Sequence, residues 1–445
     1  MSQTRESPVL ALIADLALMP AADLPERARE MARLSLMDWM ACGLAGADEP
    51  VAGALRMMIA QEGGVKAASV IGGGRAPARG AALVNGAASH ALDYDDTHFG
   101  HIGHLSVAIY PAALALGEET DQSAGAVVTA FLAGAEAAIR VGLVLGAGHY
   151  NLGFHQTATA GAFGATVAAA RLLGLSRAQI IAAIGLCATR ASGLKSQFGT
   201  MGKPYNAGIA AANGIECARL AALGMSSADD GLMGHQGFVA THAPTADETA
   251  GLTPAPAARF LFEDNKYKLH ACCHGTHAMI EALLAAPGLR GAGPERVAAL
   301  ALRTSPRWLR VCDLKQPRSG LEVKFSYGWL AGMVLRGDAT GDDRIYTDGL
   351  ALDAGLAGFA QRVTVIGDDS IGDMQAALEI TLDDGSRIVA AHDLDQPVLP
   401  AELAARLRAK AVAMLGAAGA ALWDDLADLT TVSARDLGAR LRARG

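Results

Sequence analysis

The side chains best suited to acid–base chemistry gather in one short stretch, residues 85–111, in a sequence that is otherwise 51% hydrophobic. Its titratable and hydroxyl side chains are His90, Asp93, Asp95, Asp96, Thr97, His98, His101 and His104. Because His90, Asp93 and Thr97 follow one another at helical spacing, a continuing helix would present them on one face. Two glycines then end the helix and form a loop that carries the last two histidines. A helix end followed by such a loop is typical of a polar site.

Plainer interpretations of this stretch stay open. Asp95 and Asp96 equally fit a solvated acidic cap. The histidines at 98, 101 and 104 could bind a metal, as in a metal-dependent hydrolase, but the sequence holds no HExxH, CxxC or HxH pattern. We therefore predict no metal site. A non-catalytic helical interaction protein is a further alternative.

Composition narrows the class of protein. The net charge of −8 argues against a nucleic-acid or anionic-membrane partner. The most apolar segment, residues 124–148, contains Glu136 and Arg140, so we interpret it as a buried helix and not as a membrane span. The N-terminal segment is mostly polar, and the six cysteines are scattered, which predicts a reduced, cytoplasmic protein.

The hydrophobic pattern predicts a mainly α fold: a large all-helical domain with an inserted smaller α+β lid domain. Helical periodicity dominates residues 1–265 and returns at 400–445, whereas residues 266–399 carry β-like segments. Within them, Asp384 and Gly385 form a hairpin-turn signal between two alternating runs.

Three further polar loops lie far apart along the chain. Their candidate side chains are Tyr150 and His155, then Lys203, then Lys268 and Cys273. If these loops converge on His101 and His104, the site is cationic and suits a small polycarboxylate. The sequence contains no dinucleotide or flavin motif, so we expect no cofactor, and side chains must carry out proton abstraction next to a carboxyl group.

The order of motifs resembles the MmgE/PrpD family, which includes 2-methylcitrate dehydratase, cis-aconitate decarboxylase and iminodisuccinate epimerase. The matching segments are NGAASHALDYDDTH with HLS, GFHQTATAGAFGA, KPYNAGIAAANG, YKLHACCHGTHAMIEA and VKFSYGWLAGMVLRGD. The resemblance implies a helical domain with an inserted lid, a homodimer and no cofactor. It also places active-site residues at Asp93, Thr97, His104, His155, Lys203 and Lys268.

Two features favour an epimerase within this family. Trp329 stands where the decarboxylase has a tyrosine, and the chain length resembles the epimerase-type members. We predict cofactor-independent epimerisation of an iminodisuccinate-like dicarboxylate, with a dehydratase of a 2-methylcitrate-like tricarboxylate as the alternative. The predicted catalytic residues are Tyr150, Lys268, His104 and Asp93, and the predicted substrate-binding residues are Thr97, His101, His155, Lys203 and Cys273.

Overall fold

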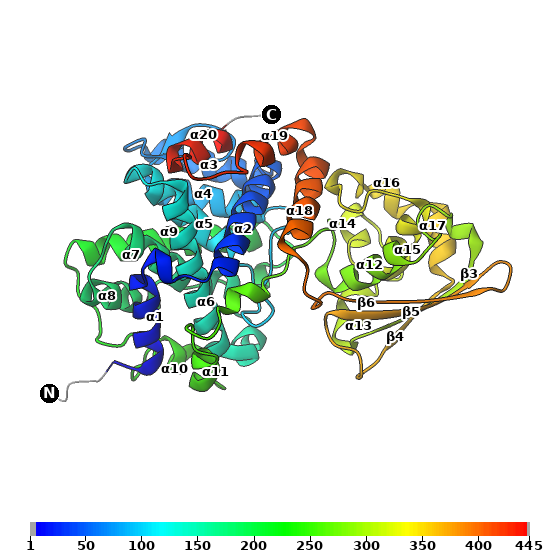
Figure 1. The fold of residues 1–445 in the computed structure, drawn as a ribbon, viewed down its shortest axis with the longest axis horizontal. Helices are drawn as coiled ribbons and strands as arrows, with labels where there is room; N and C mark the ends of the chain where they lie inside the picture. The colour runs from blue at the N-terminus through cyan, green and yellow to red at the C-terminus, as the bar shows by residue number, and fades with distance from the viewer. Residues whose placement is uncertain (1–5, 443–445) are drawn as a thin grey trace. The chain divides into compact units, whose positions relative to one another are not determined.

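The computed structural model describes residues 6–442 and divides the chain into two compact units. The first unit is Met1–Tyr267 together with Leu415–Gly445, and the second is Lys268–Met414. Figure 1 draws the helices and strands of both. The chain leaves the first unit after residue 267 and returns to it at the end of α18 (Pro400–Leu415).

Helices packed through glycine and alanine build most of the first unit. They are α1 (Pro8–Leu18), α2 (Glu26–Ala45), α3 (Pro50–Glu62), α4 (Ala78–His90), α5 (Ser106–Glu119), α6 (Ala124–Leu152), α7 (Gln156–Leu172), α8 (Arg177–Ala188), α9 (Gly202–Ala222), α10 (Phe238–His242), α11 (Glu248–Leu252), α19 (Ala417–Asp425) and α20 (Ala434–Arg442). A Cβ on Gly86 would lie 2.8 Å from Gly208 Cα, and one on Gly134 would lie 2.4 Å from Gly164 O. The pairs α4–α9 and α6–α7 therefore approach too closely for larger side chains.

The longest helix, α6, passes through the interior of this unit. By length and composition it could cross a membrane, yet 89% of its most apolar window is buried inside the protein. Its charged groups pair internally, with Arg140 Nη2 2.7 Å from Glu136 Oε1. The backbone departs from helical geometry at Gly146, and the helix ends at the left-handed Gly153.

A small sheet in the first unit corrects the predicted fold class. β1 (Ala68–Ser69) pairs antiparallel with β2 (Arg75–Ala76). The turn between them contains three glycines, residues 72–74, whose positive φ costs glycine no steric energy. Glu118 of α5 accepts hydrogen bonds from Ser69 N at 2.8 Å and Ser69 Oγ at 2.6 Å, which anchors β1. The predicted all-helical large domain is therefore wrong: the fold is helix-dominated but mixes helices with two small sheets.

The second unit contains the larger sheet, with strand order β4–β3–β5–β6. β3 (Val297–Thr304) runs parallel to β4 (Val363–Gly367) and antiparallel to β5 (Gln375–Leu382), which pairs antiparallel with β6 (Arg387–Asp393). Gly385 has φ 82° in the β5–β6 turn, so the predicted hairpin is confirmed.

Helices and this sheet together give the second unit a core of its own. The helices are α12 (His277–Ala285), α13 (Pro306–Cys312), α14 (Gly320–Val323), α15 (Tyr327–Arg336), α16 (Asp348–Ala351), α17 (Ala354–Ala360) and most of α18. α12 packs on β5 and β6. Because it is a compact body with its own sheet and core, the predicted description of this unit as a lid is not upheld.

Candidate active site

Four segments of the first unit bring acidic and basic side chains together. The segments are the end of α4, the loop before α5, the start of α7 and the start of α9. They supply His90, then Asp93, Asp95 and His104, then His155, and finally Lys203. The rings of His90 and His104 have centroids 4.6 Å apart, and those of His90 and His155 are 6.0 Å apart.

The loop after α4 is shaped by two special backbone positions. Asp93 adopts φ 51°, a left-handed conformation that aspartate tolerates better than most residues. Gly103 lies so close to α7 that a Cβ there would be 2.8 Å from Thr157 N. The backbone N–H of His104 donates to Thr157 Oγ1 at 3.0 Å. These contacts fix His104 against the start of α7.

Asp95 is the centre of the cluster and lies between two imidazoles. Its Oδ1 is 2.8 Å from His90 Nδ1, and its Oδ2 is 2.8 Å from His104 Nδ1. The second approach is within ion-pair distance but is not aligned as a hydrogen bond. Complete burial would raise the pKa of the Asp95 carboxyl, but the charges of His104 and His90 outweigh this effect and hold the pKa far below its usual range.

A chain of charges runs from His104 to Lys203. His104 Nε2 lies 3.6 Å from Asp93 Oδ1, and Asp93 Oδ2 lies 2.7 Å from Lys203 Nζ. The Asp93 side chain is 40% exposed and that of Lys203 is 16% exposed, so both are accessible to a small molecule. Burial lowers the pKa of His104, although the charges of Asp95 and Asp93 act in the opposite direction. The His104 ring is therefore mostly neutral at pH 7.

His155 is a neutral ring with a defined tautomer. Asn206 Nδ2 donates to Leu194 O at 3.3 Å and to His155 Nδ1 at 3.3 Å. Since a carbonyl oxygen only accepts, the amide orientation is settled, and Nδ1 of His155 must be the acceptor. Burial and the nearby charge of His90 hold the pKa of His155 well below its ordinary value. His155 therefore carries its proton on Nε2.

Three other predicted residues of the first unit also make contacts with residues outside this cluster. Tyr150, near the end of α6, has Lys195 Nζ 3.5 Å from its ring centroid. His101 packs against α6, with Nδ1 3.2 Å from Ala138 O, and burial lowers its pKa to about 3. Thr97 pairs through its backbone with Lys266, at 2.8 Å in both directions.

The remaining predicted residues, Lys268 and Cys273, belong to the second unit. Lys268 is buried and Cys273 is half-buried, and Cys273 N donates to Lys324 O at 3.0 Å. The predicted catalytic pair of Tyr150 and Lys268 is thus divided between the two units.

The geometry also bears on the metal alternatives. The ring nitrogens of His98 contact Leu261 O at 2.9 Å and His101 N at 3.0 Å, so backbone groups already occupy that imidazole. A different group, His90, Asp93, Asp95 and His104, has possible ligand atoms within 4.8 Å of one another. The ring nitrogens of this group, however, lie against its own carboxylate oxygens. The Lys203 ammonium pairs with the carboxylate of Asp93. The group is therefore paired internally and is not arranged around a metal position.

Two members of the cluster, His90 and Asp95, were missing from the predicted site. The sequence signal was present, because both lie in the same polar stretch as Asp93. Helical spacing does not place His90 beside Asp95, since α4 ends at His90 and the backbone is left-handed at Asp93 between them. Asp95 is fully buried, so the interpretation as a solvated cap is wrong.

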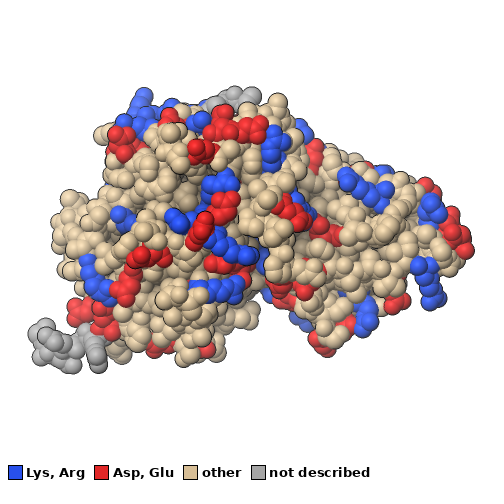
Figure 2. Space-filling model, in the orientation of Figure 1, with Lys and Arg blue, Asp and Glu red and all other residues tan. Residues whose placement is uncertain are grey.

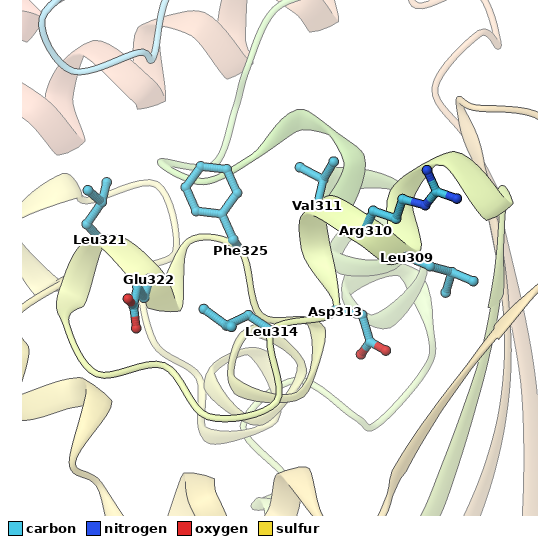
Figure 3. A pocket seen from close by; sticks show the side chains of 8 residues that line it. All are labelled: Leu309, Arg310, Val311, Asp313, Leu314, Leu321, Glu322 and Phe325. Atoms are coloured by element: carbon cyan, nitrogen blue, oxygen red, sulfur yellow. The ribbon is translucent and has the colours of Figure 1, made fainter. Parts of the chain in front are cut away.

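An apolar hollow in the second unit has a different character. Its volume is about 380 Å³, and Figure 3 shows its lining side chains, which are Leu309, Arg310, Val311, Asp313, Leu314, Leu321, Glu322 and Phe325. Two of its charges are already paired, Asp313 with Lys315 at 2.7 Å and Glu322 with Arg318 at 3.0 Å. It therefore lacks the convergent cations that a polycarboxylate needs.

Positive and negative side chains are interspersed on the face of the molecule that Figure 2 shows.

Comparisons with known proteins match nearly the whole chain to two family models. The MmgE/PrpD N-terminal domain matches residues 13–251, and the MmgE/PrpD C-terminal domain matches residues 270–418. All the residues of the cluster lie within the first match.

Curated relatives carry decarboxylase names. The chain is 31% identical over 282 residues to the cis-aconitate decarboxylase-like protein oryM of Aspergillus oryzae, covering 59% of this chain and 58% of that protein. It is 30% identical over 300 residues to a cis-aconitate decarboxylase of Aspergillus terreus, covering 61% and 58%. It is 34% identical over 174 residues to that of Homo sapiens, covering 38% and 36%. The matches thus span less than two thirds of these relatives.

Proposed function

The chain belongs to the MmgE/PrpD family, and on that premise we propose that it is a lyase of small tricarboxylates. The leading reaction is decarboxylation of a cis-aconitate-like substrate, which is supported by the names of the relatives. Epimerisation, which the sequence favoured, is set aside because none of these relatives is an isomerase. The observation that carries the proposal is the chain of contacts from Asp95 through His104 and Asp93 to Lys203.

His104 is the proposed proton donor. Decarboxylation breaks the bond between a carbon atom and its carboxylate, CO₂ leaves, and the electron pair stays on the carbon until a proton arrives. Asp95 and Asp93, which face the two ring nitrogens of His104, stabilise the protonated ring. A bound tricarboxylate adds negative charge beside the ring and raises its pKa further, so substrate binding itself favours the acid form.

Lys203 is the proposed carboxylate-binding cation. Its ammonium is already paired with the carboxylate of Asp93 at 2.7 Å, which shows that an anionic oxygen fits there. A substrate carboxylate would join or replace Asp93 beside this ammonium. Two other positions of the first unit that the resemblance assigns, Thr97 and His155, are proposed as further substrate contacts. Lys268, which belongs to the second unit, stays a prediction of the resemblance.

Dehydration of a 2-methylcitrate-like tricarboxylate is the second candidate. One observation favours it: the lowered pKa of His104 and of His155 leaves both rings neutral. A neutral imidazole can take the proton from carbon, and the imidazolium so formed can give that proton to the departing hydroxyl, which leaves as water.

Turnover in deuterated water separates these reactions. The protein is incubated with cis-aconitate or with 2-methylcitrate, and NMR spectra and released CO₂ are recorded. Decarboxylation releases CO₂ and places deuterium on the product carbon, whereas dehydration gives an unsaturated product without CO₂. Label incorporation into unchanged substrate would restore the epimerase, and no conversion of either substrate would refute the lyase.

A matched pair of lysine variants tests the binding site. Lys203→Met should raise KM at least about tenfold, because it removes the cation that holds a carboxylate. The exposed Lys66→Met removes the same charge elsewhere and should leave KM unchanged. Equal KM values for the two variants would exclude Lys203 from substrate binding.

A further inference from the structure

One carboxylate, that of Asp95, serves two histidines. Oδ1 is 2.8 Å from His90 Nδ1 and Oδ2 is 2.8 Å from His104 Nδ1. The Asp95 side chain has no exposed surface and that of His90 has none. Such an arrangement leaves each ring with one nitrogen turned to the same anion.

The chemistry of the carboxylate determines where the ring protons are. An ionised carboxylate has only acceptor oxygens, so His90 Nδ1 must be the donor. A bare imidazole nitrogen held 2.8 Å from a carboxylate oxygen would be repelled, so His104 Nδ1 must also carry a proton, even though its approach is out of line. Both rings are therefore protonated on Nδ1.

The second nitrogen of each ring, Nε2, is the atom through which that ring can exchange a proton. His104 Nε2 lies beside the accessible Asp93. His90 Nε2 is buried and has no hydrogen-bond partner among residues 6–442, although buried polar atoms are almost always partnered.

The other charged groups near these two rings pair elsewhere and not with Nδ1 of His90 or His104. Lys203 pairs with Asp93, and His155 receives its hydrogen bond from Asn206. Asp96, next in the chain, accepts from Ser106 instead. Asp95 is thus the carboxylate that faces both Nδ1 atoms.

We propose that Asp95 is a positioning residue that keeps Nδ1 of His90 and of His104 protonated, so that every proton these rings gain or lose passes through Nε2. The catalytic part of this inference rests on the proposed lyase function. The tautomer part does not, because it concerns the resting protein.

Nitrogen-15 NMR of the histidine rings tests the tautomers without any substrate. His90→Gln and His104→Gln variants assign the two signals by their disappearance. We expect a protonated Nδ1 on both rings. A bare Nδ1 on either ring overturns the inference, whether or not the protein proves to be a lyase.

Asp95→Asn tests the effect on turnover, with the adjacent buried Asp96→Asn as the matched control. The amide offers one acceptor and one donor, so one ring must move its proton to Nε2. In serine proteases the corresponding change lowers kcat about 10⁴-fold through the wrong tautomer. Here we expect kcat to fall at least about 100-fold while KM stays within about threefold.

The control gives the result that would contradict a positioning role. Asp96→Asn should keep kcat close to that of the wild type, because Asp96 contacts neither imidazole. Equal losses in the two variants would assign Asp95 a merely structural role and overturn the inference. Should Asp95→Asn not fold, the wild-type ring spectra alone decide.

Discussion

Asp96 is a carboxyl group that folding forces into the protein interior. Its Oδ1 accepts a hydrogen bond from Ser106 N at 3.1 Å, and its Oδ2 accepts from Ser106 Oγ at 2.6 Å and from Asn265 Nδ2 at 2.7 Å. Burial raises the pKa of Asp96 to about 7, against the hydrogen bond from Ser106 and with help from the negative charge of Asp95. We expect this group to make stability depend on pH.

The sign and size of the effect follow from proton linkage. The ordinary pKa of the group is 3.8, so between about pH 4 and pH 7 the folded protein holds a proton that the unfolded chain has released. Stability from this group therefore falls as pH rises through that window. At about 1.4 kcal/mol for each pKa unit, the loss reaches about 4 kcal/mol.

Asp96→Asn removes the titration and keeps the shape of the side chain. The Asn265 amide can rotate to receive the new N–H, since its Oδ1 has no hydrogen-bond partner among the described residues. The free energy of unfolding of the variant, relative to the wild type, should therefore rise by about 4 kcal/mol between pH 4 and pH 8.

Urea unfolding of both proteins, followed by far-UV circular dichroism across this pH range, measures the difference. Contributions from carboxyl groups far from Asp96 are common to both proteins and cancel. The exposed Asp48→Asn controls for the loss of one surface carboxylate. Parallel pH profiles for wild type and Asp96→Asn would refute the reasoning.

Urea unfolding checks two further predictions, and the pH dependence of the proposed decarboxylation rate checks a third. Gly134→Ala should cost about 1–3 kcal/mol of unfolding free energy, because its Cβ would lie 2.4 Å from Gly164 O; Gly53→Ala, with open space around it, should instead be neutral or stabilising by up to about 1 kcal/mol. His101→Gln should gain stability relative to wild type as the pH falls from 6.5 toward 3, because the pKa of His101 is lowered to about 3 when folded and the wild-type ring resists protonation there. Decarboxylase activity should decline as pH rises above the pKa of His104 in the substrate complex, and a rate that stays flat from acid to alkaline pH would remove His104 as the donor.

Local sequence patterns predicted helices and hairpins better than they predicted which distant residues these elements contact. The Asp384–Gly385 turn marked its hairpin because a glycine at positive φ closes the short loop between β5 and β6. The internal charges of α6 correctly indicated a buried helix. The β1–β2 pair was not predicted as a sheet, since strands of two residues carry no periodicity and depend on the distant Glu118 for anchorage.

The candidate site shows the same limit. Asp93, His104, His155 and Lys203 could be proposed from residue type and loop position, and the structure brings them close together. The role of Asp95 could not, because it depends on the left-handed backbone at Asp93 and on burial. Helical spacing of His90, Asp93 and Thr97 was the wrong guide, since α4 ends at His90.

The side chains of the candidate site lie at helix ends and in one loop, whereas glycines let the sides of these helices pack closely against each other. This arrangement separates substitutions that affect folding from substitutions that affect the reaction. Larger side chains at the glycine contacts would prevent the helices from packing. Substitutions in the candidate site can alter the reaction while the helices stay packed. A library randomised at the candidate-site residues should therefore yield many folded proteins with new substrate preferences. A library randomised at the glycine contacts should yield few folded proteins.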